Sequence, residues 1–120
     1  MPDPVVVVPE RANHIVLAGT LADKPEFRST PSGRLLACFI LEHLSQDAAF
    51  SAQRIEVRME VSALGDLATR CRSLTTGQAV CVQGRLNQKR WIRDGKIRWG
   101  AIELLAEQIN LLPDDAGNSH

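Results

Sequence analysis

The hydrophobic pattern changes its period in the middle of this chain, and that change restricts the possible folds strongly. Over residues 54–61 apolar and charged side chains alternate, which is typical of an antiparallel strand that buries one face. The apolar positions are Ile55, Val57, Met59 and Val61, and the charged positions are Arg54, Glu56, Arg58 and Glu60. Apolar residues then fall at helical spacing, at Leu64, Leu67, Ala68, Cys71 and Leu74. We therefore expect a strand followed closely by one short helix over residues 65–74.

Four further apolar runs predict strands, at residues 14–21, 34–43, 79–86 and 101–112. Residues 44–53 are mostly polar or small and predict a loop that joins two strands. Five strands with one helix between the third and the fourth describe an all-β OB-fold, a small Greek-key barrel. An SH3-like barrel is the competing small β fold, but it offers no obvious place for this helix.

The length of 120 residues fits one domain, and 44% hydrophobic content is enough for a core. We expect that domain at residues 13–112, after a flexible or extended segment at residues 1–12 and before a polar tail at residues 113–120. No apolar run is long enough to cross a membrane, and the first residues do not resemble a signal peptide, so we expect a cytoplasmic protein. The three cysteines, Cys38, Cys71 and Cys81, lie among apolar residues and predict buried, reduced thiols.

A basic segment at residues 89–98, followed directly by Trp99, is the main candidate for a functional site; we call residues 89–99 the basic hairpin. Asp94-Gly95 at its centre predicts a two-residue turn, because a type I′ turn needs positive φ at both positions. With Arg93 and Lys96 flanking the turn, one face carries Lys89, Trp91, Arg93, Lys96 and Arg98, and the other carries Arg90, Ile92, Ile97 and Trp99. An aromatic ring among cations is typical of single-strand binding, since cations attract phosphates and the ring stacks on a base.

Simpler interpretations exist for the same residues. The basic hairpin could be an exposed arm whose charges only keep it soluble, and we expect Trp99, beside Ile92 and Ile97, to pack rather than bind. The formal net charge of +0 argues at first against nucleic acid, but the basic residues cluster at residues 85–98, and a local patch sets the local field. The outer face of residues 54–61 is charge-balanced, which favours a ladder of ion pairs over a phosphate groove.

Two segments resemble bacterial single-stranded-DNA-binding proteins. The first is residues 13–21, followed by Pro25 and Ser32-Gly33, and the second is residues 77–86, followed by Arg90-Trp91 and Asp94-Gly95. Within that superfamily, residues 32–43 and 106–111 are most similar to the primosomal replication protein N (PriB) family. The resemblance spans residues 13–112 and keeps the order and spacing of these segments.

The resemblance implies a non-catalytic OB-fold homodimer that binds single-stranded DNA and helps to reload the replication machinery at stalled forks. It implies two protein partners, the restart helicase PriA and the loader protein DnaT. Arg28, Phe50 and Lys96 align with DNA-contact positions of the family, and we expect Phe50 to stack on a base from its loop rather than to anchor that loop. Arg28 and Arg34 flank the turn at residues 30–33, where they are either solvated or suited to a phosphate.

The sequence departs from the family pattern at two positions and in the length of the basic hairpin. Leu44 stands where family members often have a basic residue, and Glu56 falls where a tryptophan is frequent. The hairpin is longer than in the family and gains both tryptophans. We therefore expect the aromatic contribution to have moved from the third strand to the basic hairpin.

No catalytic or metal-binding pattern accompanies these features. The histidines show no metal-ligand spacing with the cysteines, and the sequence has neither a phosphate-binding Gly-rich loop nor a nucleophile elbow, so we expect no enzyme and no cofactor. Two alternatives to a replication-restart accessory protein stay open: a general single-strand coating protein and an OB-fold protein–protein adaptor. Coating proteins usually end in an acidic tail with an apolar tip, which the last residues here do not resemble, and salt-sensitive DNA binding would argue against the adaptor.

Overall fold

The computed structural model describes residues 5, 7–47, 49 and 53–113. Its elements, in chain order, are β1 (Ile15–Leu21), β2 (Glu26–Ser29), β3 (Leu35–Asp47), β4 (Gln53–Leu64), α1 (Asp66–Arg70), the 3-10 helix η2 (Cys71–Ser73), β5 (Ala79–Arg93) and β6 (Lys96–Leu111). The five expected strands are all present, and the expected helix is present as α1 and η2. The short strand β2 was not predicted from the sequence. No helix in this described part of the chain is long and apolar enough to span a membrane.

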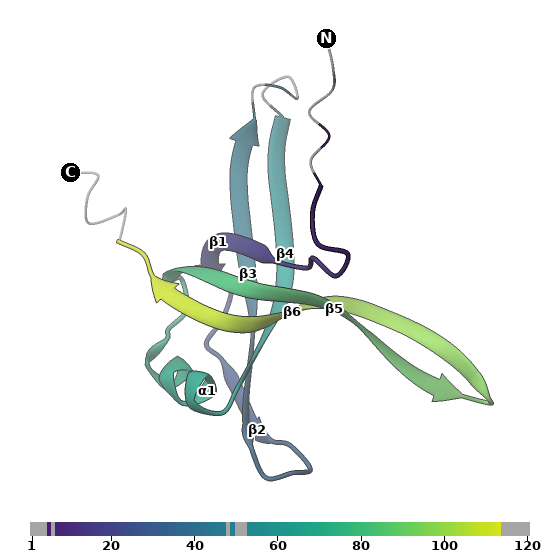
Figure 1. The fold of residues 1–120 in the computed structure, drawn as a ribbon. Helices are drawn as coiled ribbons and strands as arrows, with labels where there is room; N and C mark the ends of the chain where they lie inside the picture. Colours follow the sequence, from purple (N-terminus) through teal and green to yellow (C-terminus); the bar gives the residue numbers. More distant parts are fainter. Residues whose placement is uncertain (1–4, 6, 48, 50–52, 114–120) are drawn as a thin grey trace.

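The strands form one sheet that closes into a barrel (Figure 1). Its order is β1-β5-β6-β4-β3-β2, and β1 pairs again with β3 at Thr20↔Glu42 and Leu21↔Leu41, which joins the two sides. All pairings are antiparallel except that of β4 with β6. The closed barrel therefore has five strands, with β2 added beside β3, and the predicted OB-fold is confirmed.

The core lies inside this barrel and contains the apolar residues of the alternating strands. Its largest fully buried side chains are Leu21, Leu41, Val61, Val80, Val82, Cys71 and Leu104. The helix after β4 contributes Ala68 and Cys71 to the same core, and Leu74 follows directly after η2. The apolar residues at helical spacing therefore form the inner side of a helix that covers one end of the barrel.

Two antiparallel ribbons extend beyond the barrel, one from β3 and β4 and one from β5 and β6 (Figure 1). The first ribbon corrects the prediction of a loop at residues 44–53, because β3 continues to Asp47 and β4 begins at Gln53. The pairs Leu44↔Glu56 and Gln46↔Arg54 keep the backbone hydrogen bonding of strands although their side chains are mostly polar. Residues 44–47 of β3 have no sustained apolar period, so hydrophobicity did not reveal this arm of the ribbon, whereas the facing residues 54–57 of β4 alternate and were predicted as strand.

Candidate nucleic-acid interface

The basic hairpin is the outer part of the β5–β6 ribbon, and its turn has the predicted geometry. Asp94 has φ 54° and Gly95 has φ 74°, the left-handed values that a type I′ turn requires. The facing pairs are Arg93↔Lys96, Ile92↔Ile97, Trp91↔Arg98 and Arg90↔Trp99. The predicted register is confirmed, and with it the two faces. We call them the Trp91 face (Lys89, Trp91, Arg93, Lys96 and Arg98) and the Trp99 face (Arg90, Ile92, Ile97 and Trp99).

The indole of Trp91 lies over the backbone of Gly100 on the neighbouring strand. A Cβ atom at Gly100 would come within 2.7 Å of Trp91 Cζ3, so only glycine leaves room for the ring there. The pairing between β5 and β6 shifts register between Gln88 and Arg90, close to this contact. Trp91 is still 51% exposed, so a broad part of its surface is available to a base.

The cations of the Trp91 face are not equivalent. The Lys89 ammonium donates a hydrogen bond to the Glu60 carboxylate on β4 and forms an ion pair with it. This hydrogen bond raises the pKa of Lys89 above its usual value, so Lys89 is charged at neutral pH but already neutralised. Arg93, Lys96 and Arg98 form no ion pair with any residue that the structure describes. Unneutralised charge on this face is therefore concentrated toward the turn.

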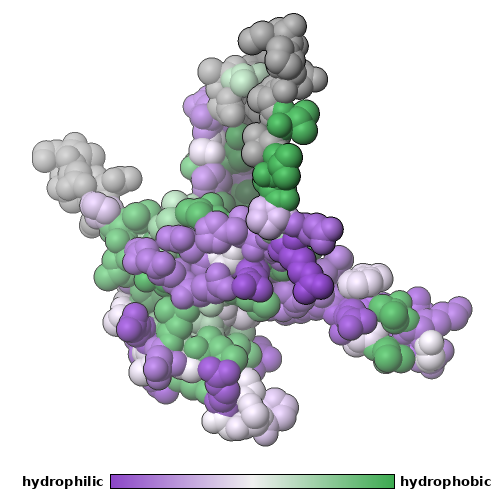
Figure 2. Space-filling view, in the orientation of Figure 1, coloured by the Kyte–Doolittle hydropathy of each residue, from purple (hydrophilic) through white to green (hydrophobic). Residues whose placement is uncertain are grey.

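The Trp99 face is exposed, which corrects the expectation that Trp99 packs. Trp99 is 61% exposed, Ile92 76% and Ile97 50%. The expectation assumed a protein body beneath this face, but the hairpin extends beyond the barrel and has none there. Figure 2 shows apolar side chains at the surface of this ribbon, beside hydrophilic ones.

The outer face of β4 carries a ladder of ion pairs, as the alternating charges predict. Arg54 pairs with Glu56 at 3.4 Å, and Arg58 pairs with Glu42 of β3 at 2.6 Å. Glu60 completes the ladder by pairing with Lys89. Because each cation of this ladder faces an acid, the β3–β4 surface attracts a phosphate backbone much less than the basic hairpin does.

A polar network at the root of the hairpin, centred on Glu103, was missed by the sequence analysis. Ser62 of β4 donates a hydrogen bond to Glu103 Oε1 at 3.0 Å, and Asn87 of β5 donates one to Glu103 Oε2 at 2.9 Å. The Gln88 side-chain amide also donates a hydrogen bond to the Gly100 carbonyl at 3.0 Å. These contacts join β4, β5 and β6 where the hairpin leaves the barrel, and they depend on the parallel β4–β6 pairing, for which the sequence offers no signal.

Of the other predicted contact residues, Arg28 shares a hollow with the acid that pairs with Lys89, whereas no residue in the described part of the chain links Arg34 to the hairpin. Arg28, on β2, is 4.0 Å from Glu26 and lines a hollow of about 200 Å³ that also includes Glu60, the partner of Lys89. Arg34 lies close to Gly65, where its guanidinium would be 2.9 Å from an added Cβ atom. Phe50 lies outside the described residues, so its predicted stacking role stays a prediction.

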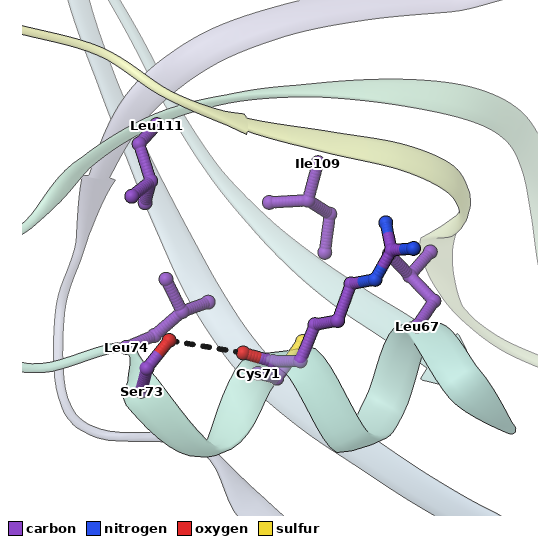
Figure 3. Close-up of a pocket in the computed structure, with 7 residues that line it drawn as sticks. Leu67, Cys71, Ser73, Leu74, Ile109 and Leu111 are labelled. Carbon is purple, nitrogen blue, oxygen red and sulfur yellow. Dashed lines mark hydrogen bonds between the residues drawn. The ribbon is translucent and has the colours of Figure 1, made fainter.

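A separate apolar cavity of about 190 Å³ lies between the helical segment and β6 (Figure 3). Leu67, Cys71, Leu74, Ile109 and Leu111 line it, together with Arg70 and Ser73. The Ser73 hydroxyl donates a hydrogen bond to the Arg70 carbonyl at 3.1 Å. Burial raises the pKa of the Cys71 thiol to about 11, so the thiol is protonated at neutral pH. Cys71 is buried and Cys38 and Cys81 are half-buried, and all three are free thiols that form no disulfide.

Comparison with known proteins places this chain in a family. A family model described as another single-strand binding protein family matches residues 13–95. The chain belongs to this single-strand binding family. The match includes Trp91 and the turn and ends at Gly95, so Trp99 and Gly100 lie outside it.

Members with curated names include a restart protein and longer single-strand binding proteins. The replication restart protein PriB of Nitrosomonas europaea is 32% identical over 89 residues, covering 73% of this chain and 81% of that protein. The single-stranded DNA-binding protein of Thermus thermophilus is 33% identical over 113 residues, covering 85% of this chain and 40% of its own length. The single-stranded DNA-binding protein of Aquifex aeolicus is 27% identical over 106 residues, covering 83% of this chain and 69% of that protein. The chain thus spans about two fifths of the Thermus protein and most of the restart protein.

Proposed function

We propose that this chain binds single-stranded DNA without catalysis, as an accessory protein of replication restart in the cytoplasm. The observation that carries the proposal is the Trp91 face, where a half-exposed indole lies beside cations that no described acid neutralises. The family match supports a single-stranded ligand, and the similarity to PriB along most of that protein's length supports the restart role.

The proposed contacts are of two kinds, phosphate neutralisation and base stacking. Arg93, Lys96 and Arg98 neutralise backbone phosphates, while Trp91 stacks on a base. Arg28 and, where the strand passes the barrel rim, Arg34 and Phe50 extend the contact. Neither kind of contact reads base edges, so homopolymers of thymine and mixed sequences should bind within a modest factor of each other.

We also propose that the protein acts as a homodimer whose protein partners are the restart helicase PriA and the loader protein DnaT. Exposed apolar side chains on the barrel strands support the dimer: Val16 on β1, and Ile102 and Leu111 on β6. A partner chain that covers part of this surface would remove it from water. Sedimentation equilibrium at micromolar concentration should give twice the chain mass, and a clean monomer would contradict the dimer.

The decisive test is the affinity for a labelled thymine homopolymer at two salt concentrations. Four phosphates neutralised by Arg28, Arg93, Lys96 and Arg98 predict a slope of log K against log salt of about −3 on single strands. Between about 50 and 200 mM salt the affinity should then fall roughly 50-fold. Duplex DNA of the same length is the control, and it should bind more weakly because its bases are already stacked on one another.

Two results would contradict the proposal. Absent or salt-insensitive binding would favour the protein–protein adaptor, with the basic hairpin as its docking arm. Equal affinity for duplex and single strands would show a purely electrostatic patch, without the stacking that Trp91 is proposed to supply.

A further inference from the structure

The basic hairpin repeats one pair of residues on its two strands. Arg90-Trp91 lies on β5 and Arg98-Trp99 lies on β6. The register places Trp91 opposite Arg98 and Trp99 opposite Arg90. Since neighbouring residues of a strand point to opposite faces, each face receives one tryptophan with one arginine directly across from it.

The Trp99 face has the same two components as the Trp91 face. Trp99 is 61% exposed, compared with 51% for Trp91. Arg90 forms no ion pair with any acid in the described part of the chain. The exposed side chains of Ile92 and Ile97 widen the apolar surface around the ring.

The two rings also border one hollow. It has a volume of about 710 Å³ and is lined by Trp91, Arg93, Asp94, Ile97, Arg98 and Trp99. One ligand in this hollow can therefore approach residues of both faces and the cations near the turn. A flexible single strand can bend around the edge of a two-stranded ribbon, which a duplex of this size cannot do.

We propose that Trp99 and Arg90 form a second single-strand contact, so that the basic hairpin stacks bases on both of its faces. This inference rests on the proposed binding of single-stranded DNA. Trp99 supplies the stacking surface, Arg90 contacts a phosphate, and the strand passes from one face to the other beside Arg93 and Lys96. The ligand class is the same as on the Trp91 face, but the contact lies beyond the segment that the family model matches.

Charge favours nucleic acid over a second copy of the hairpin as the partner of this face. The hairpin carries five cations, Lys89, Arg90, Arg93, Lys96 and Arg98, and the single acid Asp94. Two such hairpins placed face to face would bring their unneutralised cations together, and like charges at short range repel. A phosphate backbone instead supplies the opposite charge, and its bases supply flat apolar surfaces for Trp99.

The chain offers a direct assay because it contains two tryptophans and no tyrosine. In the full chain, Trp91→Ala leaves Trp99 as the only indole, and Trp99→Ala leaves Trp91. Each variant is titrated with a thymine homopolymer of roughly 16 nucleotides, the upper end of the site size of one OB-fold. We expect the homopolymer to quench the fluorescence of both variants. If Trp91→Ala does not fold, Trp91→Phe replaces it, since a smaller ring still fits over Gly100.

Affinity provides a second readout with a matched control. Trp99→Ala should weaken binding of the homopolymer about 5-fold to 150-fold, the effect of losing one stacked base. Ile92→Ala removes a still more exposed apolar side chain from the same face, one without a ring that could stack on a base, and should change affinity much less. Equal losses in the two variants would overturn the inference, because they would show that the face acts only through its general hydrophobicity.

The fluorescence results separate this inference from the proposed function. Quenching of Trp91 without quenching of Trp99 would overturn the second contact and leave single-strand binding intact. Absence of DNA binding by the unmodified chain would overturn both. A blue shift of Trp99 emission that grows with protein concentration and blocks quenching by DNA would show that a second copy covers this face, and would also overturn the inference.

Discussion

The ion pair between Lys89 and Glu60 leads to a prediction that can be worked out in detail. Glu60→Gln keeps the shape of the side chain but removes the charge that neutralises Lys89. Lys89 then becomes available to a phosphate. Because one phosphate contact contributes about 0.7 to the salt slope on a single strand, we expect the slope to steepen by that amount. At about 0.1 M salt this corresponds to roughly fivefold tighter binding.

The fold should tolerate this change. The Lys89 and Glu60 side chains are 41% and 27% exposed, and ion pairs with this access to water contribute about 0.2–1 kcal/mol. The loss is small against a typical unfolding free energy of about 5–15 kcal/mol. The pKa of Lys89 is raised by the Glu60 hydrogen bond, so losing that bond lowers the pKa toward its usual value, at which lysine is still charged at neutral pH.

A double-mutant cycle tests the assignment to Lys89. The salt slope is measured for the unmodified chain, Glu60→Gln, Lys89→Gln and the double variant. In the Lys89→Gln background, Glu60→Gln should no longer steepen the slope. Glu56→Gln is the matched control, since it removes a carboxylate from the same strand and face whose partner is Arg54.

Three outcomes would refute this reasoning. A Glu60→Gln slope that is unchanged or shallower would show that Lys89 does not reach a phosphate. An equal effect of Glu56→Gln would show that only the total charge matters. An effect that persists without Lys89 would show that Glu60 itself repels the DNA.

Three further substitutions separate the roles of cation, ring and core. Lys96→Ala should weaken binding to all sequences and make the salt slope shallower by about 0.7, whereas Arg58→Gln, which loses a cation paired with Glu42, should change the slope much less. Gly100→Ala should displace the Trp91 ring, since the added Cβ atom would lie 2.7 Å from it. We expect altered Trp91 fluorescence emission and weaker DNA binding, and unchanged emission would contradict the contact between the ring and Gly100. Leu104→Ala should lower the unfolding free energy by about 2–5 kcal/mol in denaturant titrations, because Leu104 is fully buried, without changing the salt slope of the folded fraction.

Sequence patterns predicted the parts of this fold that contact the core. Val61 on β4 and Val80 and Val82 on β5 are fully buried, and each belongs to a run with a clear period. The hairpin register was also predictable, because Asp94-Gly95 accepts positive φ at both turn positions and thereby sets the four pairs from Arg93↔Lys96 to Arg90↔Trp99. In both cases a local rule of backbone or burial determines the structure directly.

The parts that could not be predicted depend on contacts between residues that are distant in the sequence, or on whether a protein surface lies beneath a given face. Glu60 meets Lys89 only because β4 runs parallel to β6, and the two residues are 29 positions apart. Trp99 was expected to pack because its neighbours are isoleucines, but apolar neighbours do not show whether a protein surface lies beneath them. Among the missed residues, Gly100 did have a signal in the sequence. A glycine inside a strand often marks a place where another group comes close to the backbone, and here that group is the Trp91 ring.

The separation of charge in space explains how a chain of net charge +0 can present a site for a polyanion. Outside the basic hairpin, Arg54, Arg58 and Arg85 each pair with a glutamate. From Lys89 to Asp94 the strand extends about 17 Å at ~3.3 Å per residue, and charges are screened over about 8 Å at physiological salt. A phosphate near the turn therefore experiences the cations of the hairpin and little of the acids on the barrel. At about 0.01 M salt the screening length is about 30 Å, so those acids come within range, and the electrostatic attraction should rise less steeply than the slope at higher salt implies.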